Sequence, residues 1–316
     1  MVFKARRYNI MDDVLQNPAV EYRATGAVET AESTSSNRAG AMVQESAVAN
    51  ELDLNRPALV RQLVAEFIGV FALMIVVASI SYLMGNIYMQ SVQAIAYGLV
   101  IAAMVAAFAG ISGGQLNPAV TLGLLVGGRL NVARAGLIIV AQLTAAVLAC
   151  VMLKPVFGKT EIVQLDNTEP PTPIQMAVPT IPLRTVGGQP DITNKEPRVS
   201  NGQAMLIEGV LAFLWVTVFY GAILRGRSPI AGALALGALV MAAVFAGMYL
   251  TGGSLNPARA FGPAMVSGVW TSQAIYWIGP MVGGALAGLV CGWVLFRDDL
   301  DATPEEDTPT LAGYGR

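Results

Sequence analysis

The chain has 316 residues, of which 54% are hydrophobic and only 13% are charged, and its formal net charge is −2. A soluble domain carries about a quarter charged residues. Because about 20 apolar residues cross a bilayer as a helix, long uncharged stretches indicate an integral membrane protein and exclude a soluble enzyme. The near balance of 19 basic and 21 acidic residues also argues against a nucleic-acid partner. Such uncharged stretches lie at 67–128, 135–153, 209–224, 228–258 and 260–296.

The chain contains no histidine and only two cysteines, Cys150 and Cys291, both within apolar stretches. The absence of histidine removes the commonest general base and metal ligand. Two cysteines in apolar surroundings are typical of inert buried thiols. We therefore predict a protein without catalytic residues, metal or cofactor.

Taken in chain order, residues 1–56 are polar and are predicted to form a disordered tail. Residues 154–203 form a polar loop with so many prolines that no regular helix is expected there. Residues 298–316 are predicted to form an acidic C-terminal tail. Between the tails, membrane spans are predicted at about 58–84, 92–109, 133–153, 205–224, 229–250 and 272–296.

Two further apolar segments, at about 112–127 and 253–266, are too short to cross a bilayer and open with glycine pairs. Half-length segments of this kind are predicted to be re-entrant, since protein or a water-filled cavity can surround their irregular backbone. Basic residues near the span ends place both termini in the cytoplasm and the 154–203 loop outside. These basic residues are Arg56, Arg61, Arg129, Arg134, Arg225 and Arg227.

The two halves of the chain repeat each other. The segment GGQLNPAVTLG at 113–123 agrees with GGSLNPARAFG at 252–262 at seven of eleven positions. Each follows a span with one carboxylate, Glu66 in the first half and Glu208 in the second. Each half holds three full spans, an odd number, so the second copy must be inverted. The two short segments should then enter from opposite faces and meet near the middle of the membrane.

Each short segment carries the tripeptide Asn-Pro-Ala, as Asn117-Pro118-Ala119 and Asn256-Pro257-Ala258. Asparagine is a strong N-cap residue, and proline suits the first helical position. Each tripeptide is therefore predicted to begin a short helix. Two helix N-termini that meet would direct two positive dipole ends at one point, which repels cations.

On these motifs, the two membrane glutamates and the layout of six spans with two half-length segments, the chain resembles the aquaporin (major intrinsic protein) family over about residues 58–296. The resemblance implies an all-α membrane protein, with six transmembrane helices and two re-entrant half-helices in an inverted repeat. It also implies a homotetramer with one pore per subunit. Selection would depend on pore width, on hydrogen bonds along the wall, and on an arginine or half-helix dipoles that exclude protons.

The resemblance assigns roles to single residues. The selectivity filter would consist of Tyr97, Val244, Gly253 and Arg259, with Arg259 as its fixed cation. Glu66 and Glu208 would accept hydrogen bonds from the backbone of the re-entrant loops. Two departures concern selectivity. Water channels of the family resemble each other in having a histidine where this chain has Val244. Glycerol facilitators have an aspartate where this chain has Ala260. The pair Tyr276-Trp277 is similar to the water-channel branch.

We therefore expect a passive water channel that excludes ions and protons, with residues 57–297 as the channel domain in a multi-pass arrangement in the cell membrane. Its partners would be water, small neutral solutes and the lipid bilayer. Because Val244 and Gly253 are small, ammonia and hydrogen peroxide are expected to pass as well. Three alternatives remain open: a facilitator for glycerol or other small neutral solutes, a proton-coupled secondary transporter, and a junctional membrane protein with a closed pore.

Overall fold

The computed structural model describes residues 56–83, 90–157, 177–186, 189–190, 196–226 and 228–297. The predictions of an N-terminal tail and an acidic C-terminal tail concern residues that lie almost entirely outside these ranges. Within them, six helices are long and apolar enough to cross a membrane, as the sequence predicted. They are α3 (Arg56–Leu83), α4 (Gln90–Ser112), α6 (Val132–Phe157), α8 (Asn201–Val218), α9 (Pro229–Met248) and α11 (Gln273–Leu289).

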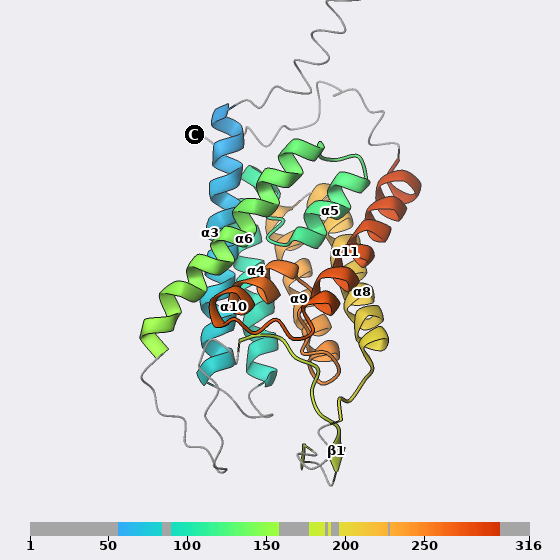
Figure 1. The fold of residues 1–316 in the computed structure, drawn as a ribbon. Coiled ribbons are helices and arrows are strands. Elements are labelled where there is room, and N and C mark those ends of the chain that lie inside the picture. Colours follow the sequence, from blue (N-terminus) through green and yellow to red (C-terminus); the bar gives the residue numbers. More distant parts are fainter. Residues whose placement is uncertain are drawn as a thin grey trace, which may run out of the picture. The chain divides into compact units, whose positions relative to one another are not determined.

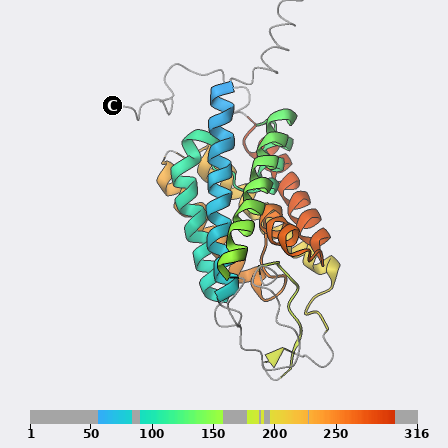
Figure 2. The same cartoon turned by 60° about the vertical axis from the view of Figure 1, so that its left-hand side comes forward.

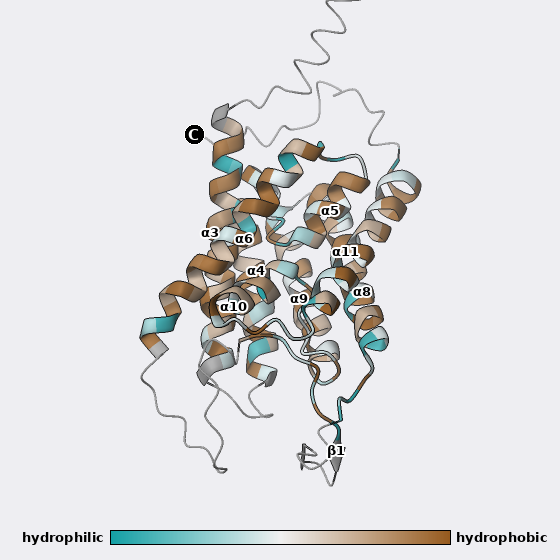
Figure 3. Ribbon diagram, in the orientation of Figure 1, coloured by the Kyte–Doolittle hydropathy of each residue, from teal (hydrophilic) through white to brown (hydrophobic). Residues whose placement is uncertain are grey.

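Hydrophobic residues predominate along these helices, while many hydrophilic residues lie at helix ends and in connecting segments (Figure 3). Large apolar side chains such as Leu99, Leu206 and Val294 are more than half exposed on the outer faces. A bilayer would cover such surfaces. The helices α8 and α11 each continue as a π-helical segment, η2 (Phe219–Leu224) and η3 (Val290–Leu295).

Two short helices lie between the spans, α5 (Pro118–Val126) and α10 (Pro257–Ser267). They have 9 and 11 residues. With a rise of about 1.5 Å per residue, each covers about half of the roughly 30 Å hydrocarbon core. Asn117 and Asn256 are their N-caps, and a proline follows each cap, so both helices begin where the Asn-Pro pairs predicted.

The packing repeats between the two halves. The helix α3 packs against α4 and α6, and α8 packs against α9 and α11. Figure 2 shows α3 in blue with α4 and α6 on either side. In Figure 1, α3 begins at the upper end and α8 at the lower end, so the first helices of the two repeats run in opposite directions. Each half-helix packs against the last span of the other repeat, α5 on α11 and α10 on α6.

Glycines on α11 allow α5 to approach closely. A Cβ added at Gly284 would lie 2.3 Å from the carbonyl oxygen of Ala119, and one added at Gly288 would lie 2.0 Å from that of Gly123. Real Cβ atoms do not come so close to backbone. The row of Gly284 and Gly288 on α11 and Gly292 on η3 therefore serves contacts within the subunit.

We predict that Gly288→Ala lowers thermal stability, because the methyl group would push α11 away from the backbone of α5. The matched control is Gly136→Ala on α6, where an added Cβ meets nothing within 4 Å. In a helix interior, alanine is favoured over glycine by about 1 kcal/mol, so the control should be neutral or stabilising. Unfolding temperatures in detergent test the pair. Equal effects of the two substitutions would contradict the close α5–α11 contact.

Some predicted boundaries were wrong. The loop was expected to begin at residue 154, yet α6 continues to Phe157 and contains Pro155. A proline loses the hydrogen bond to the carbonyl four residues earlier, but here only two residues of helix follow it. The helix α8 begins at Asn201, and not at 205, because Ser200 and Gln203 form a capping box. The pair Ser200 and Gln203 is a sequence signal for this start.

The described parts of the 154–203 loop contain a short antiparallel hairpin. Its strands are β1 (Thr185–Val186) and β2 (Gln189–Pro190), with Thr185 paired to Pro190 and Val186 to Gln189. The pairing continues towards the ends of the loop through an isolated bridge between Leu183 and Pro197. Among the described residues of this segment, the proline-rich chain thus forms local strand pairing.

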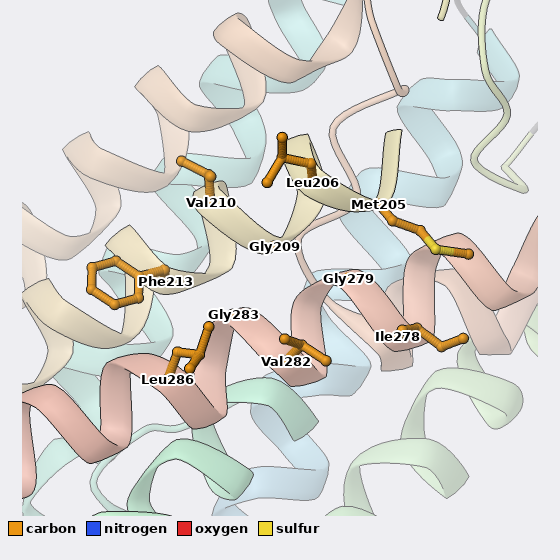
Figure 4. A pocket seen from close by; sticks show the side chains of 10 residues that line it. All are labelled: Met205, Leu206, Gly209, Val210, Phe213, Ile278, Gly279, Val282, Gly283 and Leu286. Atoms are coloured by element: carbon orange, nitrogen blue, oxygen red, sulfur yellow. The ribbon is translucent and has the colours of Figure 1, made fainter. Parts of the chain in front are cut away.

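The contact between α8 and α11 has an apolar groove on its outer side (Figure 4). Glycines of both helices form its floor, and Leu206, Val210 and Leu286 form its walls and are about half exposed or more. None of the predicted pore residues lines it. The groove therefore belongs to the outer surface of the helices, and the predicted pore residues lie elsewhere. Its lining is Met205, Leu206, Gly209, Val210, Phe213, Ile278, Gly279, Val282, Gly283 and Leu286.

Candidate functional site

The two Asn-Pro-Ala segments meet inside the protein, and both asparagines are fully buried. Asn117 Oδ1 accepts a hydrogen bond from the backbone N–H of Ala119 at 2.9 Å, and Asn256 Oδ1 accepts one from that of Ala258 at 2.9 Å. Each side-chain carbonyl thus caps its own helix, because the first N–H groups of a helix have no partner within the helix.

The side-chain amides of the two asparagines join the two loops. Asn117 Nδ2 donates to the carbonyl oxygen of Leu255 at 3.1 Å, and Asn256 Nδ2 donates to that of Leu116 at 2.9 Å. Leu116 and Leu255 have φ angles of 54° and 57°, a left-handed conformation that is unfavourable for such residues. The reciprocal hydrogen bonds stabilise this backbone and hold the two half-helices together by their N-termini.

This arrangement changes what each asparagine can offer to a passing molecule. A side-chain amide has two N–H groups, and the opposite loop takes one of them. At most one N–H of each asparagine therefore remains for a solute. The two remaining donors lie where the positive ends of two helix dipoles meet.

Glu66 is fully buried on α3 and binds the first re-entrant loop. Its Oε1 accepts from Ser112 Oγ at 2.6 Å and from the N–H of Gln115 at 2.8 Å. Its Oε2 accepts from the N–H of Leu116 at 2.7 Å and from Gln142 Nε2 at 2.8 Å. The carboxylate thus satisfies loop N–H groups that have no helical partner.

Glu208 has the equivalent position in the second repeat and is also fully buried. Its Oε1 accepts from Thr251 Oγ1 at 2.6 Å and from the N–H of Ser254 at 3.0 Å, and its Oε2 accepts from the N–H of Leu255 at 2.6 Å. Thr251 thus corresponds to Ser112. Sequence reasoning missed both hydroxyl donors, although each directly precedes a glycine pair.

Arg259 is the third residue of α10 and is only 4% exposed. Its Nε and Nη1 are buried and have no hydrogen-bond partner among the described residues. A cation in the first turn of a helix is disfavoured by the helix dipole, and a charge within the membrane is costly. An arginine at this position is therefore unfavourable for stability, which indicates a functional role.

The other predicted filter residues gather at the second re-entrant loop. Tyr97, on α4, donates its hydroxyl to the carbonyl oxygen of Ser254 at 3.2 Å. A Cβ added at Gly253 would lie 3.1 Å from the carbonyl oxygen of Val244 on α9. Gly253 itself has a φ of +58°, which favours glycine. Spans from both repeats thus contact the loop that leads to Arg259.

A segment of the long loop lies at the same place, which the sequence did not predict. A Cβ added at Gly252 would lie 2.9 Å from the carbonyl oxygen of Thr180. Ala177 and Val178 are buried. Part of the 154–203 loop therefore folds onto the second re-entrant loop, close to the predicted filter.

Both cysteines, Cys150 and Cys291, are fully buried. Within the described ranges, no group of three or more His, Cys, Asp or Glu side chains could hold a metal ion. The chemistry that the described site offers consists of fixed hydrogen-bond donors, helix dipoles and one guanidinium.

Comparison with known proteins agrees with this geometry. The chain is 36% identical over 218 residues to Aquaporin TIP4-4 of Zea mays, covering 68% of this chain and 76% of that protein. It is 39% identical over 199 residues to Aquaporin TIP4-2 of Zea mays, covering 62% and 66%. Among solved structures, the aquaglyceroporin from Plasmodium falciparum has the same fold. It matches with a TM-score of 0.58 and 18% identity over 77% of this chain and 100% of that one. The family model of the major intrinsic protein matches residues 53–291, and the chain therefore belongs to the major intrinsic protein family.

Proposed function

We propose that this protein is a passive water channel whose pore passes between the N-termini of α5 and α10. The observation that carries the proposal is the junction of the two half-helices, where Asn117 and Asn256 bind each other's loops and each retain one N–H. The proposal agrees with the printed names of the relatives, which are aquaporins. In this role the protein is a channel and not an enzyme, and it needs no cofactor.

The junction would act on water through fixed donors. The remaining N–H groups of Asn117 and Asn256 would donate hydrogen bonds to the lone pairs of a water oxygen, so that the hydrogens of the water point away from them. The two helix dipoles and Arg259 would make this stretch of the pore positive. Cations, including hydronium, would therefore face an electrostatic barrier, while neutral water would not.

The hydrogen bonds of the buried glutamates support a passive mechanism. Both oxygens of Glu66 and of Glu208 already accept from loop N–H groups and side chains. A carboxylate that took up and released protons would break these bonds in every cycle. We therefore assign both glutamates to holding the re-entrant loops, which disfavours the alternative of a proton-coupled transporter.

We assign selection to the ring of Tyr97, Val244, Gly253 and Arg259. Because Val244 and Gly253 are small, ammonia and hydrogen peroxide would pass with water. The glycerol alternative draws support from the solved aquaglyceroporin, but at 18% identity that likeness concerns the fold alone. Ala260, where an aspartate stands in glycerol facilitators, disfavours it.

We further propose a homotetramer in the cell membrane with both termini in the cytoplasm and residues 57–297 as the channel domain. The tetramer and the membrane are inferred from the family. The orientation rests on three arginines. Arg129 follows α5, Arg134 lies in the first turn of α6, and Arg225 follows η2. Such basic residues favour the cytoplasmic side.

Stopped-flow light scattering on proteoliposomes tests the proposed function. Challenges with sucrose, glycerol and ammonium should show fast water efflux, slow glycerol entry and measurable ammonia entry, each relative to protein-free liposomes. Glycerol entry as fast as water efflux would instead favour the facilitator. Water efflux that depends on an imposed proton gradient would favour a coupled transporter.

A first substitution tests the width of the filter. We predict that Val244→His lowers ammonia permeability more than water permeability, because the imidazole would fill this wall of the filter with a polar ring. Both permeabilities are measured on the same proteoliposomes, with Val244→Ile as an apolar control that also enlarges the side chain. Equal losses of both permeabilities in Val244→His would show that Val244 does not select between the two solutes.

A further inference from the structure

We propose that Trp215 of α8 lines the water path beside the filter, narrows it, and donates its indole N–H to permeating molecules. This inference rests on the proposed function, since it names a further residue that determines specificity in the same pore. The favoured solutes would be small molecules with an exposed lone pair, water and hydrogen peroxide, and glycerol would be disfavoured by size.

The position of Trp215 on α8 places it between the two re-entrant loops. It follows Glu208 by seven residues, which is two helical turns, so both side chains share one face. Glu208 binds the second loop. One turn beyond Trp215, the ring of Phe219 lies against the first loop, where a Cβ added at Gly113 would be 3.6 Å from its Cζ. Trp215 therefore lies at the level where the two loops meet.

Trp215 also meets the predicted filter directly. Its ring and the ring of Tyr97 have centroids 6.1 Å apart in an edge-to-face arrangement at 72°. The helices that carry them are not main packing partners, since α4 packs against α3 and α9, and α8 against α11 and α9. The two rings thus reach towards each other across the interior. The hydroxyl of Tyr97 is fixed to Ser254 of the second re-entrant loop.

The indole N–H of Trp215 has no protein partner in the described part of the chain, although the side chain is only 1% exposed. A buried tryptophan usually finds an acceptor for this group. Trp293, which is half exposed, donates its Nε1 to the carbonyl oxygen of Val126 at 2.8 Å. Arg259 has unpartnered N–H groups in the same way. Water in the pore would satisfy both donors.

A bulky ring at this place changes the expected width. The equivalent residue of the first repeat, seven positions after Glu66, is Leu73, and it is also fully buried. An indole is larger than this leucine and would occupy part of the space that the small Val244 and Gly253 leave open. The indole N–H would also supply a donor that valine cannot.

Cysteine substitution tests whether Trp215 faces the path. Trp215→Cys should conduct water and should lose that conduction, down to the level of protein-free liposomes, on treatment with a small mercurial. Leu214→Cys is the matched control, because Leu214 is the preceding residue on α8 and is 41% exposed on the outer surface. It should conduct with or without the reagent. The two native cysteines are fully buried, so the unmodified protein sets the background.

A second substitution tests whether the indole of Trp215 narrows the water path, and it does not depend on the cysteine variant. Trp215→Leu should raise the ratio of glycerol to water permeability several-fold. Trp270→Leu, which removes a half-exposed indole packed on Phe261 at 6.0 Å, should leave the ratio unchanged. Two results would overturn the inference about Trp215 and leave the proposed function standing, provided that the unmodified protein conducts water. One is a Trp215→Cys variant that the mercurial does not block, and the other is an unchanged ratio of glycerol to water permeability in Trp215→Leu. If the unmodified protein does not conduct water, the proposed function fails first.

Discussion

Replacing Arg259 with valine is expected to admit cations and protons while water still flows. The guanidinium is the one charged group among the described residues of α10 and its preceding loop, and its Nε and Nη1 have no protein partner. Its removal would leave only the half-helix dipoles, each equivalent to about half a charge, as the electrostatic barrier. Proton flux, followed with a pH-sensitive dye inside proteoliposomes, should rise well above that of the unmodified protein.

The control for this prediction is Arg259→Lys. It keeps the charge but loses the planar set of donors, so ion exclusion should persist while water permeability changes. Water permeability of Arg259→Val should stay equal to or above that of the unmodified protein. If the valine variant excludes protons as well as the unmodified protein does, Arg259 is not the main barrier, and the dipoles at Asn117 and Asn256 suffice.

Replacing Glu208 with leucine is expected to cause the largest loss of stability. The change would leave two buried donors without an acceptor, the N–H groups of Ser254 and Leu255. The hydroxyl of Thr251 would lose its 2.6 Å hydrogen bond and keep only a longer one, at 3.3 Å, to the carbonyl oxygen of Gly247. Each buried unsatisfied donor costs about 1–3 kcal/mol. Since a folded domain is stable by only about 5–15 kcal/mol, little folded protein should remain. Yield from membranes and unfolding temperature in detergent measure the effect.

Two further variants sharpen this test. Glu208→Gln keeps one acceptor oxygen and should lie between leucine and the unmodified protein. Glu196→Leu removes an exposed carboxylate that pairs with Arg184 at 3.0 Å, and exposed pairs contribute only about 0–1 kcal/mol. It should therefore behave almost as the unmodified protein. A Glu208→Leu variant as stable as Glu196→Leu would contradict the assignment of Glu208 to holding the loop.

Much of the fold could be predicted from local sequence signals. Long apolar stretches with few charged residues predict the six helices, because the bilayer requires about 20 apolar residues per helix. Asn117-Pro118 and Asn256-Pro257 mark the starts of the half-helices, because capping and the fixed proline φ depend on neighbouring residues only. The inversion follows from an odd number of spans in each half.

Other features depend on contacts between distant residues and leave no local signal. The hydrogen bonds from Asn117 to Leu255 and from Asn256 to Leu116 join residues 138 and 140 positions apart. The position of Thr180 against Gly252 also depends on how a proline-rich loop returns to the protein surface. The buried N–H of Trp215, which has no protein partner among the described residues, emerges only in three dimensions.

The temperature dependence of water permeability tests the central claim of a passive aqueous pore most directly. Water that crosses a lipid bilayer must leave its hydrogen bonds, whereas water in the proposed pore would exchange them for bonds to Asn117, Asn256 and Arg259. Stopped-flow shrinkage of proteoliposomes is measured over a range of temperatures against protein-free liposomes of the same lipid. The account predicts fast shrinkage with a much weaker temperature dependence than that of lipid alone. The same rate and the same steep temperature dependence as protein-free liposomes would contradict it.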